Sequence, residues 1–159
     1  MTVEHWDNIQ EREGPNESGH TMVDGVTQAE DRDRTETNRE HIRSFVDEVL
    51  VNGRLAALDR YVDPKYTEHN PRMSDGLPAL KSALSASASG AGISIVYDRI
   101  HRLLAEGNFV ICVSEGALDG VHASFYDLFR VEDGKVAEHW DTTEAIPLRS
   151  EWKNENGKF

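Results

Sequence analysis

The spacing of apolar residues changes partway along the chain, and this change restricts the fold more than any other feature. From Ile42 to Leu50 the apolar side chains recur every three or four residues, which is the pattern of one helix face. From Ile93 onward, β-branched and aromatic residues alternate with polar ones, and each run ends in a turn that contains glycine. Helices followed by consecutive antiparallel strands are typical of an α+β fold with helices on one face of a curved sheet.

The expected elements follow from these patterns and from the residues that interrupt them. Helices are predicted over residues 35–50, 55–61 and 77–88. The stretch from Asp63-Pro64 to Gly76 is predicted to be irregular, because proline and glycine bound it. Strands are predicted over residues 93–105, 109–118, 121–131 and 135–145.

Charge and cysteine content exclude several kinds of partner and site. The net charge of -12 argues against nucleic acid and anionic membranes as partners. Cys112 is the only cysteine, so we expect no internal disulfide and no cysteine-based zinc site. No HExxH or closely spaced histidine pair occurs, and we expect no metal. Without a recognisable signal peptide or membrane-spanning stretch, the expected location is the cytoplasm.

The chain divides into an N-terminal arm (residues 1–34), one domain (35–148) and a polar tail (149–159). The arm is rich in charged residues and cannot form a core of its own. Its tetrapeptide Glu4-His5-Trp6-Asp7 recurs as Glu138-His139-Trp140-Asp141. The first copy is interpreted as the remnant of a preceding repeat. It is alternatively a disordered tail, or a strand over residues 3–9 that adds to a sheet edge.

The last two predicted strands carry the candidate catalytic residues. Asp127 is the one charge in an otherwise apolar row, which is costly unless the carboxylate is paired or functional. A three-residue turn with a glycine bulge places His139 opposite Asp127 and Asp141 diagonal to it, whereas a two-residue turn separates them. We favour the bulged turn, in which an imidazole between two carboxylates keeps one of them oriented as a general base.

Other polar and aromatic residues are candidates for substrate binding. Tyr66, His69 and Asn70 cluster before the third helix, where His69 and Asn70 alternatively cap the loop. The remaining candidates lie on strands, where a solvated or packing role is the alternative: His101, Tyr126 and Trp140.

Several motifs together resemble the SnoaL-like proteins, within the superfamily of nuclear transport factor 2 and the ketosteroid isomerases. They are YTEHNP, HRLLAEGNFV and SFYDLFRVEDGKVAEHWD, and the likeness spans about residues 37–147. The resemblance implies a cone-shaped antiparallel sheet closed by three N-terminal helices around a ligand pocket. It further implies that Asp141 is the base, that Asp127 assists it, and that His69 and Asn70 line the pocket mouth. It also implies a homodimer and no metal or organic cofactor.

These observations favour an enzyme that removes a proton next to a carbonyl group, giving aldol cyclisation or isomerisation of a polyketide-like substrate. Asp141 would act as base, oriented by His139 and Asp127, while Tyr66, His69 or Asn70 polarises the carbonyl. The expected partner is a small hydrophobic ligand that contains a carbonyl. The alternative is a non-catalytic binding module or dimeric scaffold. An open pocket of about 300 Å³ or more beside Asp141 would favour a ligand site, and a plugged interior would favour the scaffold.

Overall fold

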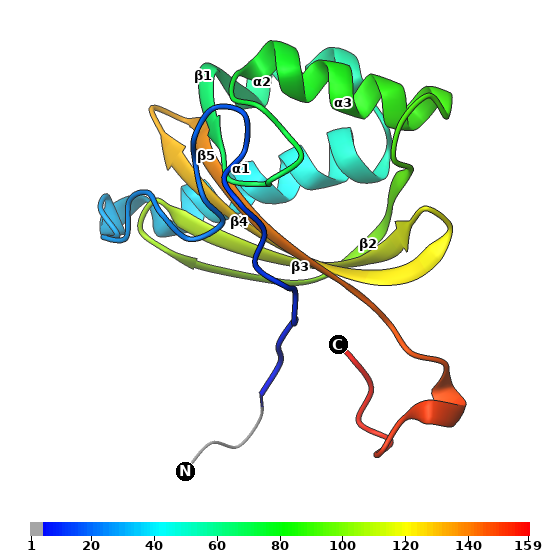
Figure 1. The fold of residues 1–159 in the computed structure, drawn as a ribbon. Helices are drawn as coiled ribbons and strands as arrows, with labels where there is room; N and C mark the ends of the chain where they lie inside the picture. The colour runs from blue at the N-terminus through cyan, green and yellow to red at the C-terminus, as the bar shows by residue number, and fades with distance from the viewer. Residues whose placement is uncertain (1–4) are drawn as a thin grey trace.

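The computed structural model describes residues 5–159, which form helices packed against a curved five-stranded sheet (Figure 1). The helical segments are η1 (Arg32–Arg34), α1 (Thr35–Phe45), the π-helical η2 (Val46–Val51), η3 (Leu55–Ala57), α2 (Leu58–Tyr61), α3 (Leu77–Ser89) and η4 (Arg149–Glu151). The strands are β1 (Val62–Glu68), β2 (Ile95–Glu106), β3 (Phe109–Leu118), β4 (Val121–Glu132) and β5 (Lys135–Ala145). The α+β class predicted from the sequence is confirmed.

The strands lie in the order β1-β5-β4-β3-β2, so the four predicted strands form an antiparallel meander. The prediction of an irregular stretch after Asp63-Pro64 was wrong, because β1 runs through it and pairs in parallel with β5. Proline is tolerated there because β1 is an edge strand, where one row of backbone groups needs no partner strand. This added strand carries Tyr66 and Glu68 to the middle of the molecule.

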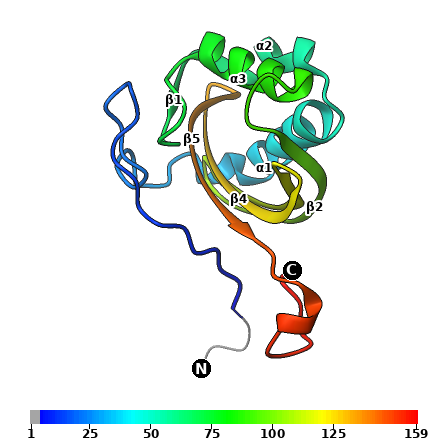
Figure 2. The ribbon, with the colours of Figure 1, turned by 45° about the vertical axis from the view of Figure 1, so that its right-hand side comes forward.

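The helices lie on the concave side of the sheet, which curls around them in the view of Figure 2. The predicted helical face is buried there: Ile42, Phe45, Val46 and Val49 are each at most 3% exposed. Phe45 meets Phe129 of β4 edge to face, with ring centroids 5.7 Å apart. The apolar core therefore fills one end of the cone. No helix in the described part of the chain is both long and apolar enough to cross a bilayer.

The β4–β5 hairpin sets which side chains face the interior. Its turn has two residues, Asp133 and Gly134, both with positive φ (49° and 74°), so the predicted three-residue turn was wrong. A bulge nevertheless follows at Ala137, where the register shifts between Val131↔Val136 and Arg130↔Glu138.

Because of the bulge, His139 and Asp141 lie on the same face of the sheet as Asp127, whereas a two-residue turn alone would have placed them on the opposite face. Asp127 lies directly opposite Asp141, and His139 lies opposite Phe129, two pairs further along the ladder and on the same face. The expected grouping of Asp127, His139 and Asp141 on the concave face is thus observed, with the positions of His139 and Asp141 exchanged relative to the expectation.

The N-terminal arm lies against the domain without forming a helix or strand between residues 5 and 31 (Figure 1). Asn8 Nδ2 donates to the carbonyl oxygens of Ser124 and Thr142, at 3.1 and 3.0 Å. The buried Asn16 donates to the carbonyl of Glu68 at 2.7 Å. The strand considered over residues 3–9 is absent from residues 5–9, and its first two residues lie outside the described part of the chain.

Candidate active site

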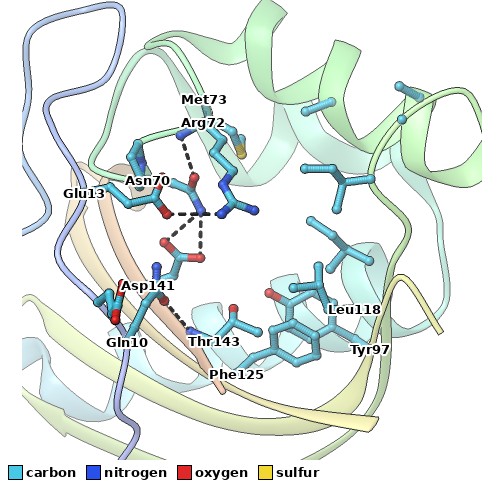
Figure 3. Close-up of a pocket in the computed structure, with 17 residues that line it drawn as sticks. Gln10, Glu13, Asn70, Arg72, Met73, Tyr97, Leu118, Phe125, Asp141 and Thr143 are labelled. Atoms are coloured by element: carbon cyan, nitrogen blue, oxygen red, sulfur yellow. Dashed lines mark hydrogen bonds and ion pairs between the residues drawn. The ribbon is translucent and has the colours of Figure 1, made fainter. Parts of the chain in front are cut away.

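Asp141 lies at the wall of a cavity of about 620 Å³ that opens between the helices and the sheet. Its carboxylate accepts two hydrogen bonds from the amide Nδ2 of Asn70, at 3.0 Å to Oδ1 and 2.9 Å to Oδ2 (Figure 3). Burial raises the pKa of Asp141 to about 6. The nearby His139 lowers this pKa, whereas the negative charges of Glu68 and Asp127 raise it further. A carboxylate with this pKa is ionised at neutral pH yet basic enough to accept a proton.

His139 lies between two buried carboxylates on the same concave face. Its Nδ1 is 3.2 Å from both oxygens of Glu68, and its Nε2 is 3.1 Å from Oδ1 of Asp127. Burial opposes the charged imidazole, but the carboxylates outweigh it and raise the pKa of His139 well above its ordinary value. Burial likewise tends to raise the pKa of Glu68, yet His139 and neighbouring donors bring it below its ordinary value. The group is therefore an ion-paired Glu68–His139–Asp127 row.

Two tyrosines, the buried Tyr66 and the half-buried Tyr97, donate to the ends of this row. Tyr66 donates to Oε2 of Glu68, and Tyr97 donates to Oδ1 of Asp127 at 3.1 Å. Burial, followed by the nearby carboxylates, raises the pKa of both hydroxyls well above the ordinary value, so both keep their protons. Oδ2 of Asp127 is buried and has no hydrogen-bond partner among residues 5–159. Asp127 lines the smaller of two adjoining cavities.

The two cavities share part of their walls. The outer cavity has a volume of about 620 Å³, and the inner one, which Glu68, Asp127 and His139 line, has about 70 Å³. The side chains common to both are Asn70, Met73, Ala83, Ile95, Tyr97 and Asp141. Asp141 and Asn70 thus stand between a ligand-sized space and a small recess with mostly apolar walls. The volume of the outer cavity falls within the range of small-molecule sites.

The outer cavity has an apolar floor and a polar mouth. Its apolar walls include Ile93, Leu118 and Phe125, while the arm contributes Gln10, Glu11 and Glu13 to the opening (Figure 3). Glu13 pairs with the guanidinium of Arg72 at 3.1 Å, and Gln10 accepts a hydrogen bond from the backbone of Thr143 at 2.8 Å. The site is therefore closed on one side by a segment that the sequence places outside the domain.

The structure brings some of the predicted site residues together. Asp141, Asn70 and Tyr66 line one or both cavities, as do Asp127 and His139. The hydrogen bonds that orient Asp141 come from Asn70, whereas His139 binds Glu68 and Asp127. His139 and Asp127 were expected to orient Asp141, but the amide of Asn70 does so instead. The ion-paired row of Glu68, His139 and Asp127 lies beside it.

Four predicted substrate-binding residues lie outside both cavities. His101, Tyr126 and Trp140 point to the outer face of the sheet, and His69, which follows the end of β1, lies against Trp140 there. The His69 ring stacks on Trp140, with centroids 4.5 Å apart and planes 8° apart. His101 lies 2.8 Å from Glu115 and stacks on Phe159 at the C-terminus. Tyr126 pairs with Thr142, which is likewise one residue away from the inward Asp141. The expected contact of these side chains with substrate therefore has no support from their positions.

Sequence reasoning missed Glu68, Tyr97 and Arg72. Glu68 sits two residues after Tyr66, and a strand over residues 62–68 would have placed both on one face. Proline and charged residues in that segment hid the alternation. Tyr97 was missed because two register shifts in β2 change which residues face inward. Only its contact with Asp127 reveals its role.

Comparison with known proteins gives a family and a fold. The family model described as a SnoaL-like domain matches residues 42–139, so its match ends two residues before Asp141. TsrD from Streptomyces laurentii is 24% identical, with a TM-score of 0.51 over 72% of this chain and 91% of that chain.

Two further solved structures share the fold. A steroid delta-isomerase from Pseudomonas aeruginosa is 18% identical (TM-score 0.55; 70% of this chain, 83% of that one). A nuclear transport factor 2-like protein from Cytophaga hutchinsonii is 16% identical (TM-score 0.56; 76% and 95%). No curated protein matches the chain. At these identities the solved structures establish the fold alone, and the chemistry must be inferred from the residues of the site.

Proposed function

Since this chain belongs to the SnoaL-like domain family, we propose that it is a cofactor-independent enzyme in which Asp141 removes a proton from a carbon next to a carbonyl group. The observation that carries the proposal is the position of this carboxylate. It is clamped by Asn70 at the wall of a cavity of about 620 Å³, and its pKa is raised to about 6. A base of that strength in such a site suits general-base catalysis near neutral pH.

The proposed chemistry moves one proton and needs no oxidant or reductant. Asp141 takes the proton from carbon, and the electron pair of the C–H bond forms an enolate on the substrate oxygen. Return of the proton to another carbon gives isomerisation. Attack of the enolate carbon on a second carbonyl of the same substrate forms a C–C bond and an alkoxide, which takes the proton from Asp141 to complete aldol cyclisation. Both outcomes regenerate the Asp141 carboxylate.

Hydrogen-bond donors near Asp141 would hold the enolate oxygen. Tyr97 lines both cavities and keeps its proton, because burial and the nearby carboxylates raise its pKa well above the ordinary value. Its hydroxyl, which now donates to Asp127, is one candidate donor, and the amide of Asn70 is the other. The apolar walls supplied by Ile93, Leu118 and Phe125 favour a hydrophobic substrate.

The experiment uses β,γ-unsaturated ketones of graded size, because their conversion to conjugated ketones requires only removal and return of a proton. The wild-type chain should accelerate both this conversion and deuterium incorporation from D₂O next to the carbonyl. Asp141→Asn keeps the size of the side chain and removes its basicity, so the rate should fall by about 100-fold or more.

Asp98→Asn is the matched control, because Asp98 is exposed and lies outside both cavities. It should keep the wild-type rate. Full activity of Asp141→Asn would remove Asp141 from the mechanism. Binding of the ketones without exchange across the whole series would favour the non-catalytic binding module instead.

Assembly and location stay predictions of the account. The family resemblance suggests a homodimer formed through the outer face of the sheet, and the composition suggests the cytoplasm. Val96 and Leu104 support the homodimer, because these apolar side chains are 46% and 63% exposed on that face and would be buried by a partner.

A further inference from the structure

A second cluster of ligand-type side chains lies on the outer face of the sheet, away from both cavities. His20 and Asp24 of the arm meet His69, and one ligand atom from each lies within 4.8 Å of the others. His69 Nδ1 is 2.8 Å from Oδ1 of Asp24 and also 2.8 Å from the carbonyl oxygen of Thr21. His69 is 1% exposed, while the two arm residues are accessible from solvent.

Both ring nitrogens of His69 face oxygen atoms, but a neutral imidazole has only one N–H to donate. Nδ1 faces the oxygens of Asp24 and Thr21, and Nε2 lies 2.9 Å from Oε1 of Glu138. A neutral imidazole carries a single N–H, so either tautomer leaves one nitrogen lone pair facing a carboxylate oxygen. A metal ion bound to Nδ1 would satisfy that lone pair and offset the negative charge of Asp24.

The contacts on Nε2 favour a metal on Nδ1. Metal-binding histidines usually donate the other N–H to a carboxylate, which fixes the tautomer and ring orientation. Glu138 fills that position for His69, and Arg130 holds Glu138 in turn at 2.7 Å. The ring is further fixed by stacking on Trp140, whose Nε1 donates to the carbonyl of Asp24 at 2.8 Å.

The arm is shaped to bring its two ligands to this place. Gly25 has φ of +101°, and a Cβ at this position would lie 2.4 Å from Oε1 of Glu138 and 2.8 Å from Trp140. Only glycine therefore allows the backbone so close to the sheet. Asp75 lies 3.2 Å from Nε2 of His20 and positions this second imidazole.

We propose that His20, Asp24 and His69 bind a divalent transition-metal ion, of which Zn²⁺ is the best match, and that the ion fastens the arm to the domain. Two imidazoles and one carboxylate are ligands that zinc prefers, whereas Mg²⁺ and Ca²⁺ prefer oxygen alone. The expectation of no metal rested on sequence spacing, which could not show that His69 meets residues 45 or more positions earlier. Because the arm also lines the cavity mouth, the ion would fix that wall.

Calorimetric titration of the untagged full chain, freed of metal by a chelator, tests the proposal with ZnCl₂ as the probe. We expect one Zn²⁺ per chain and no comparable binding of Mg²⁺ or Ca²⁺. His20→Ala and Asp24→Asn should each weaken zinc binding by about 10-fold or more. Both residues are accessible and their replacement should leave the fold intact, which circular dichroism checks.

His122→Ala is the matched control, because His122 also pairs with a carboxylate, Glu115, but lies outside the cluster. It should bind zinc as the wild type does. Zinc should also slow proteolysis of residues 11–30 in the wild type and not in His20→Ala. Absence of stoichiometric zinc binding, or equal binding by wild type, His20→Ala and Asp24→Asn, would overturn the proposal. None of these measurements depends on catalysis by Asp141.

Discussion

At the scale of single residues, the site contains two carboxylates with opposite energetic roles. Glu68 is stabilised as an anion by His139, by the Tyr66 hydroxyl and by the backbone N–H groups of His69 and Asn70. Asp141 has one amide partner, and its burial disfavours the charge. The first carboxylate therefore supports the fold, whereas the second is held in a destabilised, reactive form.

Asp141→Asn should accordingly stabilise the protein at neutral pH. Because the pKa of Asp141 is raised in the folded state, its contribution to stability is present at low pH and is lost as pH rises through about 6. The variant has no ionisable group at this position, so it does not lose this stability as pH rises. Its free energy of unfolding relative to wild type should increase by about 1–3 kcal/mol between pH 4 and pH 7, measured by urea denaturation. A difference that does not change with pH would show that Asp141 titrates normally.

Glu68→Gln should have the opposite effect on stability. Removing this charge leaves His139 buried with one carboxylate instead of two, which should lower the free energy of unfolding by about 3 kcal/mol at pH 7. Glu132→Gln is the control, since Glu132 is exposed and pairs with Arg130 at the surface. Urea unfolding of both variants measures the difference. Equal stability of the two would mean that the Glu68–His139 pair contributes little.

At the scale of elements, the β4–β5 hairpin determines the site. Alternation along β5 sends His139 and Asp141 to the cavities and Glu138 and Trp140 to the arm, so the segment Glu138–Asp141 serves both faces. This arrangement depends on the two-residue turn and on the bulge at Ala137 together.

The turn gives a prediction of its own. Gly134 has φ of +74° with open space around it, so Gly134→Ala should cost about 1 kcal/mol through backbone strain alone. Gly14→Ala is the control, because Gly14 also has open space but no positive φ, and it should be neutral or slightly stabilising. Chemical denaturation compares the two. If they are equally stable, the turn does not have the described conformation.

The elements also show what the sequence could and could not predict. The sequence predicted β3 and β5 at their observed bounds because glycine-containing turns flank β3 on both sides and precede β5, and a proline follows the end of β5. It missed β1, whose partner β5 is distant in sequence and whose proline suggests a break. Alternation predicted that His139 and Asp141 share a face, whereas Asp127 shares it only because of the bulge at Ala137, which replaces the three-residue turn that the sequence favoured. The Asn70 clamp was not, because it joins two segments that only the tertiary fold brings together.

At the scale of the whole molecule, residues near both ends of the described chain lie against the outer face of the sheet. Asn8 binds Ser124 there, and Phe159 stacks on His101 with ring centroids 3.9 Å apart. Whether the first EHWD copy descends from a preceding repeat stays a hypothesis. In the structure, the arm that contains it serves as a cover for the sheet edge and the cavity mouth.

The uncovered part of the outer face leads to a prediction about assembly. If it forms a homodimer contact, light scattering after size-exclusion chromatography should give twice the mass of one chain. Replacing both Val96 and Leu104 by Asp should then yield a folded monomer, because charges at the centre of an apolar contact prevent association. A wild-type chain that stays monomeric at high concentration would contradict this prediction.

The central claim is that Asp141 is the base, and the pH dependence of deuterium incorporation into an accepted ketone tests it most directly. The account predicts that the rate rises with pH and levels off above an inflection near pH 6, where Asp141 loses its proton. Asp141→Asn should show no inflection and at most about one hundredth of the wild-type rate. A wild-type profile without that inflection, or an unchanged profile in Asp141→Asn, would contradict the claim.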